Sequence, residues 1–328
     1  MNNIPYYSVS EYYKDTYGEK VYKLPIKLSL TCPNRDGSCG VGGCIFCSEA
    51  GGSFENLPTN MTVEEQLSSN KDYIGSRYKA NKFIAYFQNF SNTYMPLSEF
   101  KEVINACNKD YIVAIAVSTR SDCVTYDKLV FLNEFREKTG IDITFELGLQ
   151  TANYKTLDIL NRGESLADFI RTASLLKEFD IRVCTHVILS LPWDDIRDVI
   201  ESARIINALS VKEVKMHSLF IVKDTKLANM YLNNEIKMIS KEEYQRNVIE
   251  FLRYLDKDVA IARLVGRAPK EETLFCNWDT SWWLIRDEIV KYMNNNGIVQ
   301  GDKSKNKIFE KIKEDWNDLF SIRWARCW

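Results

Sequence analysis

Apolar and polar residues alternate along several short stretches of the chain, and helical segments separate these stretches. In the first one, residues 21–30, every second residue from Tyr22 to Leu30 is apolar. This period of two residues predicts a β-strand. The same pattern predicts five further strands, over residues 82–88, 111–118, 141–149, 181–190 and 212–220.

The segments between these strands are predicted to be helices. Thr62 and Glu65 have the spacing of a capping box, which predicts a helix from there to about residue 80. Because strands and helices then alternate, we expect a parallel sheet with right-handed crossovers. The predicted fold is α/β, a partial (βα)6 barrel that is open on one side, with helices over residues 97–108, 126–138, 153–161, 166–179 and 195–209.

The fourth predicted strand has two different faces. Its odd-numbered residues from Ile141 to Leu149 are apolar, whereas Glu146 and Gln150 belong to a polar face. A fully buried parallel strand usually lacks such alternation. We therefore expect the polar face to line a barrel interior that holds a polar ligand. The alternative is an antiparallel, half-solvated strand, and the flanking strand–helix pattern argues against it.

The chain's two histidines lie on the next two predicted strands, His186 on the fifth and His217 on the sixth, where Lys215 is also found. A single histidine is more often a hydrogen-bonded core residue than a catalyst. Two histidines on neighbouring barrel strands, next to a lysine, make a functional site about as favoured as a structural role in the core. Barrel enzymes place their chemistry at the carboxyl ends of the strands. Glu146, His186 and Lys215 are therefore candidate catalytic residues.

Both ends of the chain fall outside the repeat. The tyrosine-rich residues 6–20 predict a short helix ending at Gly18, packed against the floor of the domain rather than forming a lid.

Past residue 232, Ser240 and Glu243 predict a capped helix to about residue 255. We divide the chain into a core, residues 1–235, and a small, mostly helical extension that caps the barrel, residues 236–328. The extension is expected to contain a candidate strand at 259–264, a helix from the tryptophans near 278–283 to Gly297, and a charged amphipathic helix over 303–328.

Composition narrows the class of protein. The 328 residues are 45% apolar, enough for one large domain or two ordinary ones, and the net charge of −2 provides no global basic field for nucleic acid. An RNA partner would need a local basic patch. No apolar run reaches membrane-spanning length, and the polar N-terminus differs from a signal peptide. We expect a cytoplasmic protein with reduced thiols and no membrane partner.

The main chemical feature is one stretch, residues 32–47, which contains four of the nine cysteines. Six of its residues are Gly, Pro or Asn, which predicts a loop. Cys44 and Cys47 place two sulfurs on one turn, and Cys32 supplies a third from the end of the preceding strand. Such a loop can wrap a metal centre.

Three kinds of centre or bond could use these thiols. Structural zinc prefers two close pairs of ligands, and this chain has one Cys-x-x-Cys pair, although a zinc loop that also uses Cys39 remains an alternative. A disulfide framework is unusual in a long chain without a signal peptide. An iron–sulfur cluster is held by cysteine thiolates, and three ligands would leave one iron open to a substrate or cofactor.

The loop resembles the cluster loop of radical S-adenosylmethionine (SAM) enzymes: Cys-Pro-Asn-Arg-Asp-Gly, a short step, and then Gly-Gly-Cys-x-Phe-Cys. Its long first spacing resembles the elongator-type branch of that superfamily and, within it, the bacterial YtqA/YhcC group. The resemblance covers roughly Tyr12 to Leu255. Further matching motifs lie at residues 86–94, 118–123, 146–151 and 182–186.

This resemblance implies a (βα)6 core and a 4Fe–4S cluster bound by Cys32, Cys44 and Cys47, with SAM on the fourth iron. It implies cleavage of SAM to a 5′-deoxyadenosyl radical, which abstracts a hydrogen atom from the substrate. Cys39 falls at a variable position of the family loop and is left out of the ligand set. Phe46 is similar to the aromatic residue that packs on the adenine, and the candidate SAM contacts are Gln88, Arg120, Glu146 and Gln150.

The resemblance also implies a class of substrate. The YtqA group is associated with modification of the tRNA wobble uridine, where a carboxymethylaminomethyl group is converted toward aminomethyl. The implied partners are tRNA and a reducing electron donor such as flavodoxin or ferredoxin. Two alternatives stay open: a radical SAM enzyme that acts on a small molecule or a protein, and a non-enzymatic zinc or iron–sulfur binding module.

Overall fold

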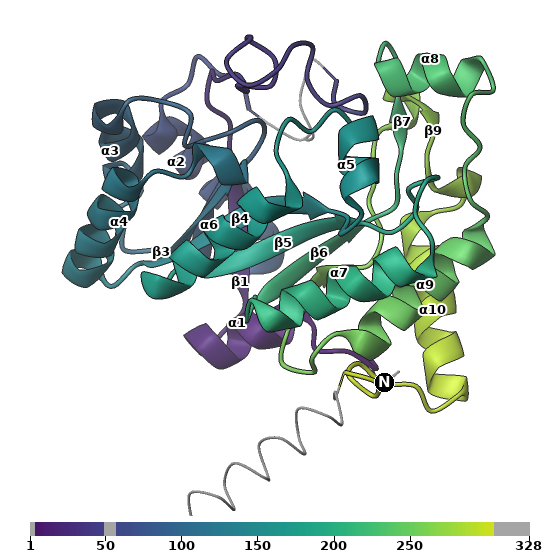
Figure 1. Cartoon of the computed structure of the whole chain (residues 1–328). Helices are drawn as coiled ribbons and strands as arrows, with labels where there is room; N and C mark the ends of the chain where they lie inside the picture. Colours follow the sequence, from purple (N-terminus) through teal and green to yellow (C-terminus); the bar gives the residue numbers. More distant parts are fainter. Residues whose placement is uncertain (1–3, 49–56, 305–328) are drawn as a thin grey trace, which may run out of the picture.

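Seven parallel strands form one sheet in the order β1-β2-β3-β4-β5-β6-β8, and helices cover its outer side (Figure 1). The computed structural model describes residues 4–48 and 57–304. All six predicted strands are present, together with the candidate strand near 259–264. The strands are β1 Val21–Ile26, β2 Lys82–Phe87, β3 Ile112–Thr119, β4 Asp142–Gln150, β5 Arg182–Ile188, β6 Glu213–His217 and β8 Ala260–Arg263.

The helices connect successive strands, as the alternating pattern predicts. The capping box at Thr62 and Glu65 is formed, and the N-cap Ser240 accepts a hydrogen bond from the Glu243 backbone N–H. Short strands β7 Ile221–Val222 and β9 Thr273–Phe275 pair separately. The helices are α1 Val9–Tyr17, α2 Val63–Tyr78, α3 Leu97–Asn105, α4 Tyr126–Thr139, α5 Tyr154–Ile159, α6 Leu166–Glu178, α7 Ile196–Ala208, α8 Lys226–Leu232, α9 Lys241–Tyr254 and α10 Trp282–Asn295.

Strand β1 ends at Ile26, four residues before its predicted end. The side chain of Gln66, on α2, accepts a hydrogen bond from the Lys27 backbone N–H at 2.9 Å and donates one to the Lys27 carbonyl at 3.0 Å. The Gln66 side-chain amide thus takes the hydrogen bonds that a neighbouring strand would otherwise make with Lys27. Residues 27–31 leave the strand direction and lead into the loop that begins at Cys32.

Helix α1 packs at the floor of the barrel, as its sequence predicts. It ends at Gly18, whose φ of 80° is the left-handed conformation that glycine adopts without strain. The buried Tyr13 donates a hydrogen bond to Glu213 at the start of β6. Tyr7, just before the helix, accepts a backbone hydrogen bond from Ile261 of β8. The N-terminal segment therefore lies next to β8, the last strand of the sheet.

The chain past residue 235 contributes to this same sheet, because β8 pairs with β6. Helix α9 packs against α7, and α10 packs against α9 (Figure 1). The predicted tryptophan helix is α10, although Trp278 itself precedes it in a left-handed conformation. The helix expected over 303–328 falls outside the described residues from 305 onward. No helix within the described ranges has the length and apolar character needed to cross a bilayer.

Asp194, in the turn after β5, gives a testable pH dependence. Burial raises its pKa to about 6, although Thr156 donates to the carboxylate at 2.6 Å. The folded state therefore holds this proton more tightly than the unfolded chain, and stability falls as the pH rises from about 4 to 6. At pH 7.5 we expect Asp194→Asn to raise the melting temperature, with a gain of at most about 3 kcal/mol in the free energy of unfolding. At pH 4 the substitution should change the melting temperature little. Thermal unfolding at both pH values tests this, and an equal shift at both would contradict it.

Candidate active site

A cavity of about 620 Å³ opens at the carboxyl ends of the strands. One wall is the cysteine loop, and the rest comes from the ends of the strands and the turns that follow them. Every site residue predicted from the sequence lines it. These residues are Cys32, Cys44, Phe46, Cys47, Gln88, Arg120, Glu146, Gln150, His186 and Lys215.

Three of the four loop cysteines face this cavity. Cys44 is buried, Cys32 and Cys47 are half-buried, and all three are free thiols. Cys39 is exposed and is not part of the cavity lining. Burial, together with the neighbouring Cys44 sulfur, raises the pKa of Cys47 to about 11. The Cys47 thiol therefore stays protonated until a cationic centre binds it.

The loop is held in place by a fully buried side chain, Asn34. Its amide donates to the Asn161 carbonyl at 2.6 Å and lies 3.7 Å from the Cys44 sulfur. Two glycines make room for it: a Cβ on Gly40 would lie 2.2 Å from Asn34 Oδ1, and one on Gly163 would lie 2.8 Å from it. The cysteine loop is thus fixed against the turn between α5 and α6.

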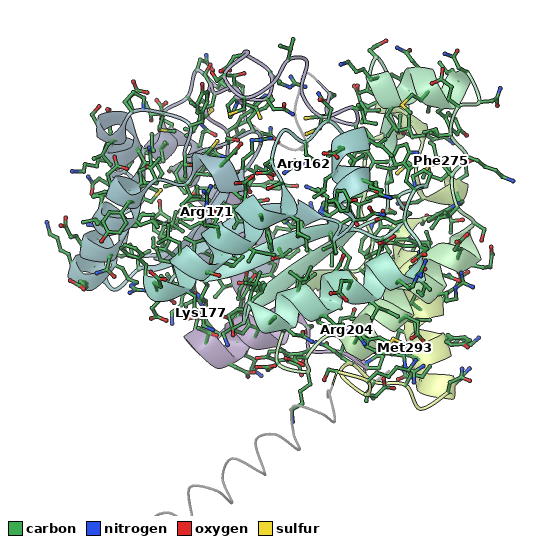
Figure 2. All side chains as sticks on the ribbon, in the orientation of Figure 1. Arg162, Arg171, Lys177, Arg204, Phe275 and Met293 are labelled. Carbon is green, nitrogen blue, oxygen red and sulfur yellow. The ribbon has the colours of Figure 1, made fainter. Side chains whose placement is uncertain are left out.

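Arg162, in that turn, is a site residue that the sequence analysis missed (Figure 2). Its Nη1 lies 3.6 Å from the Cys44 sulfur, and its Nη2 pairs with Glu164. Arg120 donates to the Arg162 carbonyl at 2.6 Å and is itself paired with Asp122. Two guanidinium groups therefore lie behind the loop, where they stabilise negative charge on thiolates. Arg162 was missed because it lies in a turn, where no alternation of polar and apolar residues identifies the side chains that face the site.

The spread of the three loop sulfurs distinguishes between metal centres. Four sulfurs around one zinc ion, each about 2.3 Å from it, would lie within about 4 Å of one another. Among the described residues, the one set of three potential ligand atoms within 4.8 Å of one another is that of Glu146, Cys184 and His186. The loop cysteines are spaced more widely, as a cluster requires when each thiolate binds a different iron.

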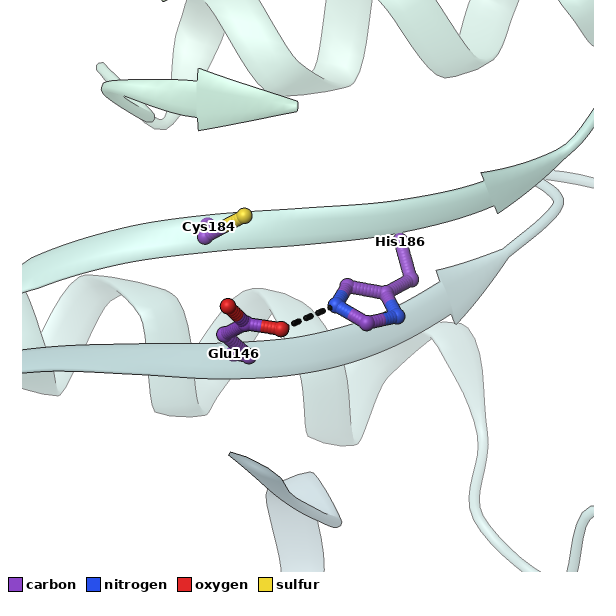
Figure 3. A group of neighbouring side chains, drawn as sticks. All are labelled: Glu146, Cys184 and His186. Atoms are coloured by element: carbon purple, nitrogen blue, oxygen red, sulfur yellow. Dashed lines mark hydrogen bonds and ion pairs between the residues drawn. The ribbon is translucent and has the colours of Figure 1, made fainter. Parts of the chain in front are cut away.

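The set of Glu146, Cys184 and His186, which lies on β4 and β5, does not suit a metal ion (Figure 3). Lys23 Nζ lies 2.5 Å from Glu146 Oε1, and Lys215 Nζ lies 2.8 Å from Oε2. A divalent cation bound here would be next to two ammonium groups. Burial and the Glu146 charge also hold the pKa of Cys184 well above its usual range, so its thiol stays neutral.

Glu146 is instead the centre of a hydrogen-bonded network. Besides the two lysines, His186 Nε2 lies 2.7 Å from Oε2, and the Tyr86 hydroxyl donates to Oε2 at 2.9 Å. Burial acts to raise the pKa of Glu146, but Lys215 and Lys23 outweigh it and hold the pKa well below its usual range. The carboxylate is therefore ionised, and protein groups occupy both of its oxygens.

The two histidines are neutral bases in this cavity. Burial, followed by the Lys215 charge, lowers the pKa of His186 to about 4. Burial and Arg263 hold the pKa of His217 well below its usual range. Their rings lie 5.2 Å apart, and Arg263 Nη2 lies 2.6 Å from His217 Nδ1. Lys215 also donates to the Tyr86 hydroxyl at 3.0 Å, so one polar surface connects β2, β4, β5, β6 and β8.

The chain was compared with known families and proteins. The model of the Radical SAM superfamily matches residues 29–206, and that of the Radical_SAM C-terminal domain matches residues 211–295. The YtqA protein of Bacillus subtilis is 31% identical over 94% of both chains. The YhcC protein of Escherichia coli K12 is 31% identical over 86% of this chain and 90% of its own.

More distant proteins also match. A tRNA uridine(34) acetyltransferase of Methanocaldococcus jannaschii is 26% identical over 61% of this chain and 36% of its own. Among solved structures, Elp3 of Methanocaldococcus infernus superposes with a TM-score of 0.63 and 17% identity, covering 85% of this chain and 64% of that one. The fold is therefore the same, although the sequences have diverged.

Proposed function

The chain belongs to the radical SAM superfamily, and from this premise we propose that it modifies tRNA, converting a carboxymethylaminomethyl group on the wobble uridine toward aminomethyl. Membership rests on the family match over residues 29–206 and on the relatives at 31% identity. The chain is thus a radical SAM enzyme, and enzymes of this family use a 4Fe–4S cluster and SAM. The observation that carries the proposal is a loop with three free thiols facing a polar cavity.

We assign the cluster to Cys32, Cys44 and Cys47. Their wide spacing suits a cluster better than a single ion, and Arg162 lies 3.6 Å from the Cys44 sulfur. When bound, the cluster supplies one electron that splits SAM and yields a 5′-deoxyadenosyl radical, which takes a hydrogen atom from the substrate. The protein's own contribution is to bind, to orient and to exclude water.

SAM would lie beside the loop. Phe46, between two of the ligands, is placed to pack on the adenine, and Gln88 and Gln150 line the same part of the cavity. Gln150 has a φ of 63°, a conformation that turns the chain at the end of β4. Burial acts to lower the pKa of Arg120, but its hydrogen bonds to Asp122 and the charge of that carboxylate raise it above its usual range, with smaller contributions from the nearby Cys32 and Cys44. We propose that these four residues bind the adenine, ribose and amino-acid parts of SAM.

The part of the cavity that would bind the substrate is the polar surface around Lys215 and His186. Lys215 is held by Glu146 and Tyr86, which leaves one N–H of its ammonium to face the cavity. His186 is neutral, and because its Nε2–H donates to the ionised Glu146, the other ring nitrogen carries no proton and can accept one. We propose Lys215 and His186 as the residues that touch the substrate, and Glu146 as the positioning residue that orients both.

The assignment to tRNA is supported by two features. Distant relatives include a tRNA uridine(34) acetyltransferase, and the chain shares its fold with Elp3. The cavity is also lined with more basic than acidic side chains, which suits a substrate group that carries a carboxylate. A reduced flavodoxin or ferredoxin would supply the electron.

One experiment tests the proposed function. Anaerobically reconstituted, reduced enzyme is incubated with SAM and tRNA from a strain that lacks the gene, and nucleosides are measured by mass spectrometry. We expect carboxymethylaminomethyluridine to fall, aminomethyluridine to rise, and 5′-deoxyadenosine to form in proportion. The matched control is tRNA from the parent strain, which should already be modified. Formation of 5′-deoxyadenosine with no change in any nucleoside would exclude the tRNA step while leaving the radical SAM activity.

A further inference from the structure

The deep end of the cavity contains an arginine with no carboxylate partner. Arg263, on β8, has His217 as its closest polar partner, with 2.6 Å between Arg263 Nη2 and His217 Nδ1. Its Nε is buried and forms no hydrogen bond, and no ion pair among residues 4–48 and 57–304 includes this side chain. Arg263 as a whole is half-buried, and a guanidinium held partly out of water normally has a carboxylate or carbonyl partner, because its desolvation is otherwise uncompensated.

The charges around Arg263 do not balance it. Glu146 is the nearest carboxylate, and Lys23 and Lys215 already share its two oxygens. A second buried carboxylate, Glu213, lies at the floor, where it accepts a hydrogen bond from Tyr13, and burial raises its pKa. Even with both carboxylates ionised, Lys23, Lys215 and Arg263 carry one more positive charge than the two carboxylates neutralise. An anionic ligand would neutralise it.

We infer that Arg263, together with Lys215 and His217, forms a subsite for a carboxylate group of the substrate. All three side chains line the cavity. Lys215 offers the remaining N–H of its ammonium, and Arg263 offers the part of its guanidinium that lines the cavity, a planar donor geometry that fits a carboxylate. This inference rests on the proposed function, because the group to be removed there contains a carboxylate.

The subsite lies apart from the part of the cavity assigned to SAM. Arg120 donates to the Arg162 carbonyl, and Arg162 Nη1 lies 3.6 Å from the Cys44 sulfur, whereas Arg263 contacts His217 on β6. Arg120 therefore belongs to the cysteine-loop side and Arg263 to the barrel interior. A carboxylate bound at Arg263 would hold the substrate at the far end of the cavity from the loop.

The test measures binding to the SAM-loaded holoenzyme by anaerobic titration calorimetry. The probes are two nucleosides that differ by one carboxymethyl unit, 5-carboxymethylaminomethyluridine and 5-aminomethyluridine. For the wild type we expect the acid to bind about 10- to 100-fold more tightly than the amine, the range of a charge-assisted hydrogen bond. Arg263→Gln should remove this preference and leave binding of the amine unchanged, whereas Arg263→Lys should keep part of it.

Two controls separate a binding role from a structural one. Arg246→Gln removes an exposed arginine on α9 and should bind both nucleosides as the wild type does. An arginine whose charge has no carboxylate partner adds little to the stability of the fold, so Arg263→Gln should keep its cluster and melt at the same or a higher temperature. An undiminished preference for the acid in Arg263→Gln would overturn the subsite, and so would a large fall in its melting temperature with the preference intact.

The experiment distinguishes a failure of the tRNA assignment from a failure of the subsite. Should neither nucleoside bind and no tRNA be modified, the proposed function fails and inorganic sulfate becomes the probe. Stabilisation of the wild-type holoenzyme by sulfate, lost in Arg263→Gln, would retain the anion subsite for another acidic substrate. Equal stabilisation of both proteins by sulfate would overturn the subsite as well.

Discussion

Replacing Cys32, Cys44 or Cys47 with alanine is expected to abolish cluster loading completely. All three thiols face the same cavity, and three thiolates are the minimum that holds a four-iron cluster with one iron open. Each variant should lose its brown absorbance and its bound iron after anaerobic reconstitution. Metal analysis of the purified proteins measures this directly, and no 5′-deoxyadenosine should form from SAM.

Cys39→Ala is the matched control for these three variants. Cys39 lies in the same loop, but it is exposed and does not line the cavity. The variant should bind iron and cleave SAM as the wild type does. If Cys39→Ala lost its iron while Cys32→Ala kept it, the assignment of the loop would be wrong, and a zinc loop that uses Cys39 would become the better explanation.

The sequence was sufficient to predict the fold and the position of the cavity, because both depend on local patterns. Alternation and capping residues specify the strands and helices, and the parallel arrangement then brings their carboxyl ends to one edge. Glu146, His186 and Lys215 lie on neighbouring strands with the same alternation, so their meeting in the barrel follows from the register of β4, β5 and β6. The cysteine loop is contiguous in sequence and could be recognised directly.

The residues that were missed are those whose role depends on the curvature of the whole sheet. The apolar face of β1, with Leu24 and Ile26, is buried in the main core, while Lys23 on the opposite face reaches Glu146. Periodicity identifies the two faces of β1 but does not show which side chains of distant strands meet on the inner side of the curved sheet. Arg263 was missed because β8 is only four residues long and follows the repeat.

The largest expected loss of stability concerns Glu146. Its buried carboxylate is the shared partner of two partly buried lysines, Lys23 and Lys215, and Glu146→Gln leaves both ammonium groups without that partner. Removing one partner of a buried ion pair typically costs about 3–5 kcal/mol, which for a chain of this length corresponds to a fall in melting temperature of roughly 4–7 °C. Because the folded-state pKa of Glu146 is depressed, its contribution is present at neutral pH and disappears as the pH falls below about 4.5.

Glu213→Gln provides the control within the same barrel. Glu213 is equally buried, on β6, but burial raises its pKa, and its hydrogen bond from Tyr13 can be kept by an amide oxygen. Its replacement at pH 7.5 should therefore change the melting temperature by no more than about 2 °C, in either direction. Thermal unfolding of both variants at pH 7.5 and pH 4 tests this contrast. Similar melting temperatures for the two variants at pH 7.5 would show that Glu146 does not balance the lysines, and its positioning of Lys215 and His186 would then have to be abandoned.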